Sequence, residues 1–175
     1  MFYVFLDVDG VINAISKKPP VQNTGWTGEW REEKIEGWSI LWSTELIEHL
    51  NFLNTLDDVQ IVVLSTWRRK AVDHLFPVVG LTAKEDWVVL NDVEVGSGYA
   101  GGWGSMGKWW KLDEVQDFVD AHPEDKFIWL DDDIGWDKTA RGYVENHPEI
   151  LAISPQTSHG LTTNHIKAIM DFINE

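Results

Sequence analysis

The 175-residue chain contains no cysteine, which excludes disulfide bonds and thiolate metal sites and disfavours zinc. It also has few basic residues, with 14 Lys and Arg against 29 Asp and Glu, for a formal net charge of −15. Binding of duplex nucleic acid by bulk charge is therefore not expected, because phosphate contacts need clustered Lys and Arg. Any anionic substrate must be met by local groups.

Long apolar runs are also missing. The first run, residues 2–6, is too short for a signal-peptide core or a membrane span, and no basic segment precedes it. Together with the lack of cysteine, this favours a cytoplasmic protein with no membrane partner. Because 43% of the residues are apolar, we expect residues 1–175 to form a single domain around one hydrophobic core.

Two carboxylates follow directly on the first apolar run, in the sequence Leu6-Asp7-Val8-Asp9-Gly10-Val11. Five consecutive apolar residues are typical of a strand buried on both faces, and the strand period of two places Asp7 and Asp9 on the same side. Carboxylates this close repel each other unless a cation lies between them or one is protonated. The pair therefore indicates a reactive or metal-binding site, although an Asp-Gly pair is also a common start of a turn.

Further β-rich runs alternate along the chain with segments of helical periodicity. The expected strands are residues 59–64, 87–90, 127–130 and 150–153. The expected helices are residues 44–56, 68–75, 109–121 and a closing helix that begins near Thr162 or Thr163. This alternation predicts an α/β fold, with a parallel sheet and helices on both of its faces.

Three of the predicted strands end in polar side chains. These are Asp7 with Asp9, Ser65 with Thr66, and the run Asp131-Asp132-Asp133. Because parallel sheets bind ligands at the carboxyl ends of their strands, we expect these side chains to meet in one crevice. Converging carboxylates form a hard-oxygen site, which suits Mg²⁺ with water and a substrate phosphate completing its shell.

Within such a crevice, Asp7 and Asp9 can divide the work of phosphoryl transfer. One carboxylate attacks the phosphoryl group to form an aspartyl-phosphate, while the second protonates the leaving oxygen and then activates water. We expect Ser65 and Lys108 to balance the charge that gathers on the phosphoryl oxygens. The alternative for Lys108 is an exposed position at the start of a helix.

In this order the motifs resemble those of the haloacid dehalogenase (HAD) superfamily of phosphohydrolases. The resemblance rests on Asp7-x-Asp9-Gly10-Val11, on Ser65 after a hydrophobic strand, on Lys108 and on the acidic cluster after Leu130. The stretches Leu64-Ser65-Thr66-Trp67-Arg68, Trp129-Leu130-Asp131-Asp132-Asp133 and Gly160-Leu161-Thr162 are similar to small HAD domains of multidomain RNA-repair proteins. The superfamily implies a three-layer, Rossmann-like α/β fold. The lack of a long insertion implies that there is no large cap domain.

The resemblance assigns a role to each residue of the first and third motifs. Asp7 would be the nucleophile and a Mg²⁺ ligand. Asp9 would be the general acid and base, with its backbone carbonyl on the metal. Gly10 would allow the tight turn that aims both carboxylates, and Lys108 would neutralise the nucleophile and the phosphate.

The resemblance leaves two residues undecided, the phosphate-binding hydroxyl and the last Mg²⁺ ligand. Ser65 would bind the phosphoryl group, with Thr66 as its rival because it is adjacent and also hydroxylated. Asp131 or Asp132 would supply the remaining Mg²⁺ ligand, since the run of three Asp leaves the ligand ambiguous. Asp137 would contact the metal-binding residues without binding the metal itself.

Two segments show neither a strand nor a helix pattern. Residues 14–42 hold four Trp among Gly, Glu and Lys and are interpreted as an irregular insertion or flap. Residues 96–107 hold six Gly in twelve and are interpreted as a glycine-rich loop. Most of the 11 Trp are expected in packing, but some could stack on bases or sugars. The candidates are Trp26, Trp30, Trp38, Trp67 and Trp103.

Two basic segments allow more than one interpretation. Arg68-Arg69-Lys70 follows the second strand end, where Arg68 could bind substrate by holding a nucleic-acid backbone, or the segment could form a solvated helix face. Residues 102–108 match the pattern G-x-x-x-x-G-K, but Trp109 stands where a nucleotide-binding loop has a Mg²⁺-binding Ser or Thr. A nucleoside triphosphatase is therefore disfavoured.

Together these observations predict a Mg²⁺-dependent phosphomonoesterase that works through an Asp7 phospho-enzyme. The resemblance implies a phosphorylated substrate, a terminal phosphate of RNA or DNA, which a site without a large cap can admit. The enzymatic alternative is a nucleotidase that acts on free nucleotides. The alternative from another class is a non-catalytic acidic binding protein that retains the fold, which the large negative charge favours and the intact motif residues disfavour.

Overall fold

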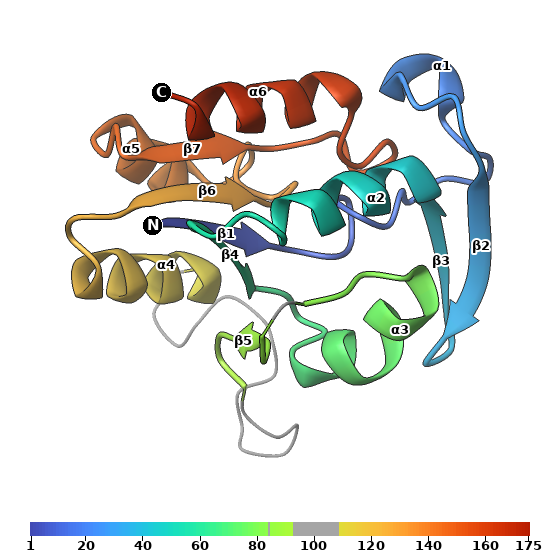
Figure 1. Cartoon of the computed structure of the whole chain (residues 1–175), viewed down its shortest axis with the longest axis horizontal. Helices are drawn as coiled ribbons and strands as arrows, with labels where there is room; N and C mark the ends of the chain where they lie inside the picture. The colour runs from blue at the N-terminus through green and yellow to red at the C-terminus, as the bar shows by residue number, and fades with distance from the viewer. Residues whose placement is uncertain (84, 93–108) are drawn as a thin grey trace.

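The sheet at the centre of the molecule is built from five parallel strands in the order β5-β4-β1-β6-β7 (Figure 1). The structure, a computed structural model, describes residues 1–83, 85–92 and 109–175. The strands are β1 (Phe2–Leu6), β4 (Val59–Val63), β5 (Val88–Val89), β6 (Lys126–Leu130) and β7 (Ile150–Ile153). The predicted α/β fold with a parallel sheet is confirmed.

Strand β1 lies between β4 and β6, and this position determines where the site forms. The chain runs from β1 to β4 and β5 on one side, then crosses to β6 and β7 on the other. Leu6 pairs with Val63 of β4 and with Leu130 of β6, so the three strands end at the same level. Sheets of this kind bind ligands where the strand order changes direction, which here is at β1. The three predicted polar strand ends therefore meet at one edge.

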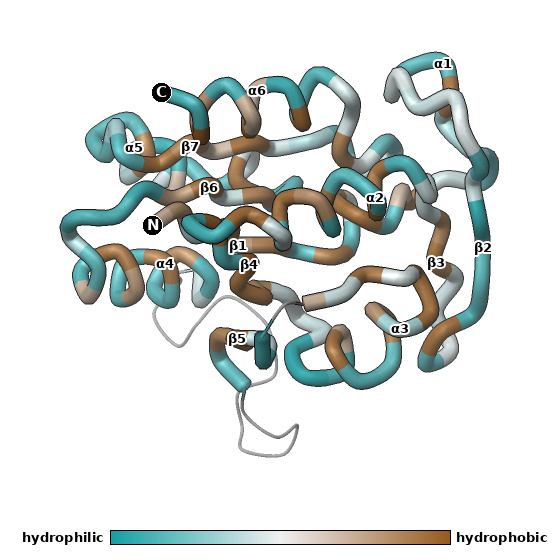
Figure 2. Tube along the Cα trace, in the orientation of Figure 1, coloured by the Kyte–Doolittle hydropathy of each residue, from teal (hydrophilic) through white to brown (hydrophobic). Residues whose placement is uncertain are grey.

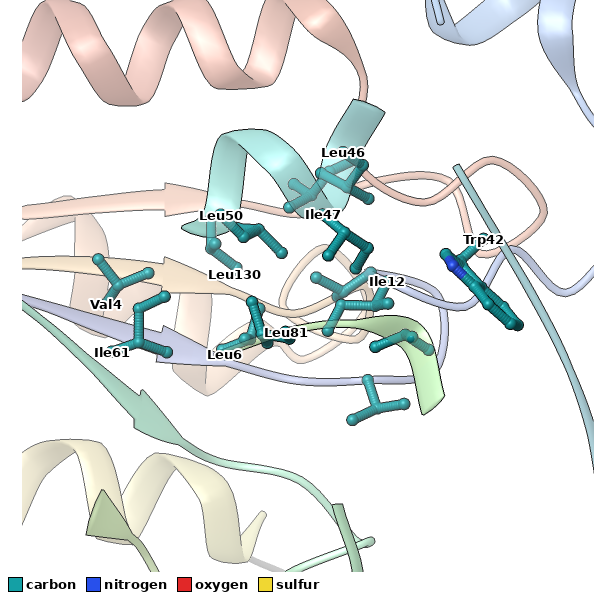
Figure 3. Packing of buried hydrophobic residues seen from close by; sticks show 14 of the residues in the cluster. Val4, Leu6, Ile12, Trp42, Leu46, Ile47, Leu50, Ile61, Leu81 and Leu130 are labelled. Atoms are coloured by element: carbon teal, nitrogen blue, oxygen red, sulfur yellow. The ribbon is translucent and has the colours of Figure 1, made fainter. Parts of the chain in front are cut away.

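Helices cover both faces of the sheet and complete three layers. One face carries α2 (Thr44–Leu53) and α6 (Thr163–Ile173), and the other carries α4 (Trp110–Ala121) and α5 (Lys138–Glu145). Successive strand residues point to opposite faces of the sheet. Val4 and Leu6 pack beneath α2, whereas Phe5 packs towards α4. Figure 3 shows the first of these layers, with Leu46, Ile47 and Leu50 of α2 close to the strand residues.

Polar caps begin the helices of the first face. Ser43 accepts a hydrogen bond from the backbone N–H of Leu46 at the start of α2. Thr162 and His165 form a reciprocal capping box at the start of α6. The predicted closing helix and its beginning near Thr162 or Thr163 are confirmed.

Residues 14–42 are not an irregular segment, and that part of the prediction is wrong. They contain most of an ordered antiparallel hairpin. The elements are α1 (Val21–Thr24), β2 (Trp30–Ile35) and β3 (Trp38–Ser43). Strand β2 is mostly exposed and hydrophilic (Figure 2), whereas β3 buries Ile40, Leu41 and Trp42. The backbone N–H of Leu41 also donates to Oδ1 of Asn13, which ties the hairpin to the turn after β1.

The segment after β4 also differs from its prediction. The expected helix over residues 68–75 is a short π-helix, η1 (Ala71–Leu75), which continues into α3 (Phe76–Val79). The insertion between β1 and α2 is only the short helix and the hairpin, and the described ranges hold no large cap domain. None of the helices in these ranges is long and apolar enough to cross a membrane. Residues 96–107 lie outside the described residues, so the glycine-rich loop stays a prediction.

Candidate active and metal site

Asp7 and Asp131 extend the β1–β6 pairing by one residue beyond the strand ends. The backbone N–H of Asp7 donates to the carbonyl of Leu130, 3.1 Å away, which keeps the two strands in register. Asp7 and Asp131 each lie two residues beyond a strand residue, Phe5 or Trp129, that packs on the α4 side of the sheet. The alternation of strand side chains thus directs both carboxylates towards α4.

Lys111 of α4 reaches between these two carboxylates. Its Nζ lies 2.6 Å from Oδ2 of Asp7 and 2.6 Å from Oδ2 of Asp131. The three side chains are 4%, 7% and 0% exposed, in the order Lys111, Asp7 and Asp131. Oδ1 of Asp7 accepts the backbone N–H of Val8, and Oδ1 of Asp131 accepts that of Asp133. Charged partners and backbone donors therefore hold both carboxylates in fixed orientations.

The sequence interpretation assigned the charge-neutralising role to Lys108, which lies outside the described residues. Lys111, which it did not consider, occupies the buried position. A signal for it was present: Lys111 precedes Val115 by four residues and Val119 by eight, so it lies on the apolar face of its helix. A lysine on that face needs a buried partner, because a buried ammonium without one is costly.

Asp132 completes a group of three acidic side chains. One carboxylate oxygen from each of Asp7, Asp131 and Asp132 lies within 4.8 Å of the other two. The hydroxyl of Thr157, in the loop after β7, donates to Oδ2 of Asp132 at 2.5 Å. Gly10 makes room for this carboxyl, since a Cβ at that position would lie 2.3 Å from the Cγ of Asp132. Its φ of +72° also favours glycine.

Burial and mutual repulsion shift the titration of this cluster. Burial raises the pKa of Asp131 to about 8, Asp7 adds to the rise, and Lys111 opposes it. Burial alone would lower the pKa of Lys111, but the charges of Asp7 and Asp131 raise it above its ordinary value. Burial also raises the pKa of Asp132 against the hydrogen bond from Thr157. Among the described residues, three carboxylates therefore share one ammonium, and further positive charge is favoured there.

The donor set fits a hard divalent cation. It consists of carboxylate oxygens on separate strand ends, and such oxygens are the ligands that Mg²⁺ and similar ions prefer. The expected pair Asp131 and Asp132 both contribute to the group with Asp7. The carboxylate of Asp9 is not part of the group among the described residues, and its expected metal contact was through its backbone carbonyl.

The carboxylate of Asp9 is held by two side-chain donors. Nδ2 of Asn13 donates to Oδ1 of Asp9 at 2.8 Å, and Nε1 of Trp67 donates to Oδ2 at 2.9 Å. The side chain is half-buried. The indole of Trp67, one of the Trp candidates, therefore orients an acidic side chain and links the loop after β4 to the loop after β1.

The residues after β4 divide into buried and exposed positions. Ser65 is fully buried, and its Oγ accepts the backbone N–H of Trp67, whereas Thr66 is exposed. Arg68 has a φ of +50° and is buried beside the ring of Trp110 in α4, so it is not on a solvated helix face. Ser65 and Arg68 thus lie at the same sheet edge as the carboxylates.

Other candidate residues have structural partners away from the carboxylates. The side chain of Arg69 pairs with Asp92, and that of Lys70 pairs with Glu36, both at the surface. Asp137 caps α5 by accepting the backbone N–H of Ala140 at 2.7 Å. Capping accounts for the position of Asp137, for which the sequence analysis had instead predicted contact with the metal-binding residues.

The remaining Trp candidates are spread over the molecule. Trp26 is buried and donates through Nε1 to the carbonyl of Leu161 at 2.8 Å. Trp30 is half-buried in β2, and Trp38 is 69% exposed at the start of β3. Trp103 lies outside the described residues. Among these candidates, only Trp67 bonds a predicted site residue in the described part of the chain.

Three comparisons with known proteins were made, and one of them found a match. A search of curated proteins and a search of solved structures each found no match. A family model described as the HAD domain in Swiss Army Knife RNA repair proteins matches residues 3–166. The match spans all three strand ends of the site together with α4 and Lys111. The chain therefore belongs to the family of HAD domains found in Swiss Army Knife RNA repair proteins.

Proposed function

We propose that the protein is a Mg²⁺-dependent phosphomonoesterase that removes a terminal phosphate from RNA or DNA through an aspartyl-phosphate on Asp7. Its HAD family membership suggests a phosphohydrolase, and the acidic cluster fits a metal site. The observation that carries the proposal is the buried contact of Lys111 with Asp7 and Asp131 at the ends of neighbouring strands. The family's description, which names RNA repair proteins, motivates the choice of a nucleic-acid end.

The first step of the proposed reaction is attack by a carboxylate oxygen of Asp7 on the phosphorus. A P–O bond forms to Asp7 while the ester P–O bond breaks, and Asp9 gives a proton to the leaving oxygen. In the second step Asp9 takes a proton from water, which attacks the same phosphorus. The acyl-phosphate P–O bond then breaks, which releases inorganic phosphate and restores Asp7.

Neighbouring residues support these roles. Asn13 and Trp67 hold the carboxylate of Asp9 in a fixed orientation, as an acid and base must be held. Lys111 offsets part of the negative charge of Asp7 and Asp131, which helps an anionic phosphate to approach the nucleophile. We assign to Lys111 the role that the sequence interpretation gave to Lys108.

Phosphate binding and metal binding complete the proposal. Ser65, with Thr66 as its rival, would donate to the phosphoryl oxygens, and buried Arg68 would add positive charge at the same edge. Asp7, Asp131 and Asp132, with the backbone carbonyl of Asp9, would hold Mg²⁺. When bound, the ion neutralises phosphoryl oxygens and orients the phosphate towards the nucleophile.

The direct test is release of phosphate from a 3′-phosphorylated oligoribonucleotide with and without Mg²⁺. We expect Mg²⁺-dependent release by the wild type and none detectable with Asp7→Asn, because an amide is a poor nucleophile. Asp57→Asn, a change at an exposed Asp before β4, is the matched control and should retain activity. Full activity of Asp7→Asn would refute the mechanism.

The choice of substrate needs a second comparison. A nucleoside monophosphate and the same nucleotide at the end of an oligomer are offered at equal concentration. Faster turnover of the oligomer supports an end-processing enzyme, and faster turnover of the free nucleotide supports the nucleotidase alternative. Stable binding of the oligomer with no turnover of any phosphate ester would support the non-catalytic alternative.

A further inference from the structure

A cavity of 190 Å³ lies beside the carboxylate cluster, lined by Trp109, Asp133, Trp136 and Asp137. Trp109 immediately precedes α4, and the other three residues lie between β6 and α5. Nζ of Lys111 lies 5.7 Å from the centre of the Trp109 ring, and the same atom bonds Asp7. The cavity is therefore next to the position that a phosphate would take at Asp7.

The two indoles of the cavity are held differently. Trp109 stacks on the buried ring of Trp129, with ring centres 5.4 Å apart and planes at 21°. Trp136 is 85% exposed, more than any other large hydrophobic side chain in the described residues. Packing explains the position of Trp109 but not that of Trp136. An exposed indole beside a firmly packed one offers a flat ligand two aromatic surfaces at little entropic cost.

The carboxylates among the described lining residues, Asp133 and Asp137, are hydrogen-bond acceptors. Asp133 is exposed, and Asp137 caps α5 through Oδ1, so within the described part of the chain its Oδ2 is left for a ligand. Two carboxylates repel a phosphate but accept N–H groups from the edge of a ring. The exocyclic amino groups of cytosine and adenine are donors of this kind, whereas the corresponding position of uracil or thymine carries an acceptor oxygen.

The size of the cavity limits its occupant. A cavity of about 150 Å³ can hold benzene, whereas pockets for drug-sized ligands measure about 300–1,000 Å³. A volume of 190 Å³ therefore suits one flat heterocycle and excludes a whole nucleotide. The sugar and phosphate of such a ligand stay outside the cavity, on the side of Lys111 and Asp7.

We propose that this cavity binds the nucleobase of the substrate and favours bases with an exocyclic amino group over uracil and thymine. Trp109 and Trp136 stack on the ring, and Asp133 and Asp137 accept from its amino edge. The proposal rests on the proposed function, because the base belongs to the nucleotide whose phosphate lies at Asp7. Recognition of the base itself requires no turnover.

The kinetic test compares 3′-phosphorylated oligoribonucleotides that end in cytidine or in uridine with glycerol 2-phosphate, which has no base. For the wild type we expect KM to be at least about tenfold lower for the cytidine end than for the uridine end. Trp136→Ala should raise the ratio of KM for the cytidine end to KM for glycerol 2-phosphate by at least about tenfold. Phe52→Ala, at an exposed aromatic of α2, is the matched control and should leave this ratio unchanged.

The carboxylates are tested by Asp133→Asn. An amide donates as well as accepts, so the preference for the cytidine end over the uridine end should fall to about threefold or less. An unchanged KM ratio in Trp136→Ala, or a wild type that does not distinguish the two ends, overturns the proposal.

A binding experiment separates this proposal from the proposed function. Cytidine and uridine, which carry no phosphate, are titrated into the wild-type protein, and NMR follows the indole N–H signal of Trp136. This signal is assigned by its absence from the spectrum of Trp136→Phe. We expect cytidine to shift the signal at lower concentration than uridine. If cytidine shifts it but no oligonucleotide is hydrolysed, the base site stands and the phosphatase proposal fails. If oligonucleotides are hydrolysed and neither nucleoside shifts it, the base site fails and the phosphatase proposal stands.

Discussion

Lys111 is buried between two carboxylates, and none of the three charges is stable there alone. Removing a buried charge from water costs several kcal/mol, and a close partner of opposite sign offsets that cost. Lys111 contacts both Asp7 and Asp131, so it offsets the burial of two charges at once. The same contacts place positive charge where a phosphate must approach, so stability and proposed activity depend on one side chain.

Lys111→Met is therefore expected to lower the free energy of unfolding by about 3–5 kcal/mol, because it leaves two buried carboxylates without their ammonium. Phosphatase turnover should be lost as well. Urea unfolding and a phosphate-release assay measure the two effects. Lys108→Met is the matched comparison, and a greater loss of turnover in that variant would contradict the assignment of the role to Lys111.

Gly10 tests the geometry of the metal group. Gly10→Ala should lower stability through its positive φ, by about 1–3 kcal/mol, and should also push the carboxyl of Asp132 away. Gly37→Ala is a matched control, because Gly37 has a φ of +86° but no atom within 4 Å of an added Cβ. We expect Gly10→Ala to be less stable than Gly37→Ala by at least about 1 kcal/mol and to bind Mg²⁺ more weakly. Equal urea midpoints and equal Mg²⁺ affinities would contradict this account.

The sequence predicted that Asp7 and the run from Asp131 would meet at one edge of the sheet, because the apolar runs before them are typical of buried strands. The register of β1 with β6 brings Asp7 together with Asp131 and Asp132. Lys111 was missed because its partners lie 104 and 20 residues away. Its helix-face position indicated burial, but it did not indicate which groups would surround it.

At the scale of elements, the β2–β3 hairpin is part of the fold rather than a detachable flap. Trp42 is 2% exposed in the cluster beneath α2, whereas Trp38 of the same strand is 69% exposed. Trp42→Ala should lower the free energy of unfolding by about 3–5 kcal/mol. Trp38→Ala should change it by no more than about 0.5 kcal/mol. Urea unfolding measures both, and similar losses would show that the hairpin does not pack as described.

Helix α5 and strand β2 bury few side chains, and the sequence did not predict either of them. Helix α5 buries only Ala140, and β2 buries only Ile35, so neither shows a clear apolar period. Helices α2 and α6 each have a buried apolar face and a polar cap, and both were predicted. The π-helical turn at Ala71–Leu75 has the same short-range pattern as an α-helix, so periodicity does not distinguish the two.

At the scale of the whole molecule, the fold concentrates negative charge in one buried place. The chain carries a net charge of −15, and in the ranges that the structure describes three of its carboxylates share a space with one ammonium, that of Lys111. Any divalent cation is attracted by the field of the molecule, but only a site of converging oxygens holds it in place. Binding of a divalent cation should therefore raise the free energy of unfolding by more than a monovalent salt does at the same ionic strength.

The raised pKa of Asp131 makes stabilisation by a bound cation depend on pH. Its pKa is raised from 3.8 to about 8 in the folded protein. The stability that its bound proton contributes is complete below about pH 4 and is lost as the pH rises through about 8. Mg²⁺ competes with this proton for the same oxygens. It should therefore bind more tightly, and stabilise the protein more, at alkaline pH.

Thermal unfolding with and without Mg²⁺ at about pH 6 and about pH 9 measures this linkage. At 100 times its Kd, Mg²⁺ adds about 2.7 kcal/mol, which is a rise in Tm of about 5–10 °C for a chain of this length. At the same Mg²⁺ concentration the rise should be smaller near pH 6, where Asp131 retains its proton. NaCl at equal ionic strength controls for screening of the acidic surface. Asp131→Asn, which removes the titrating group, should reduce the difference between the two pH values. An equal rise in Tm at both pH values, or the same rise with NaCl, would contradict a cation bound among these carboxylates.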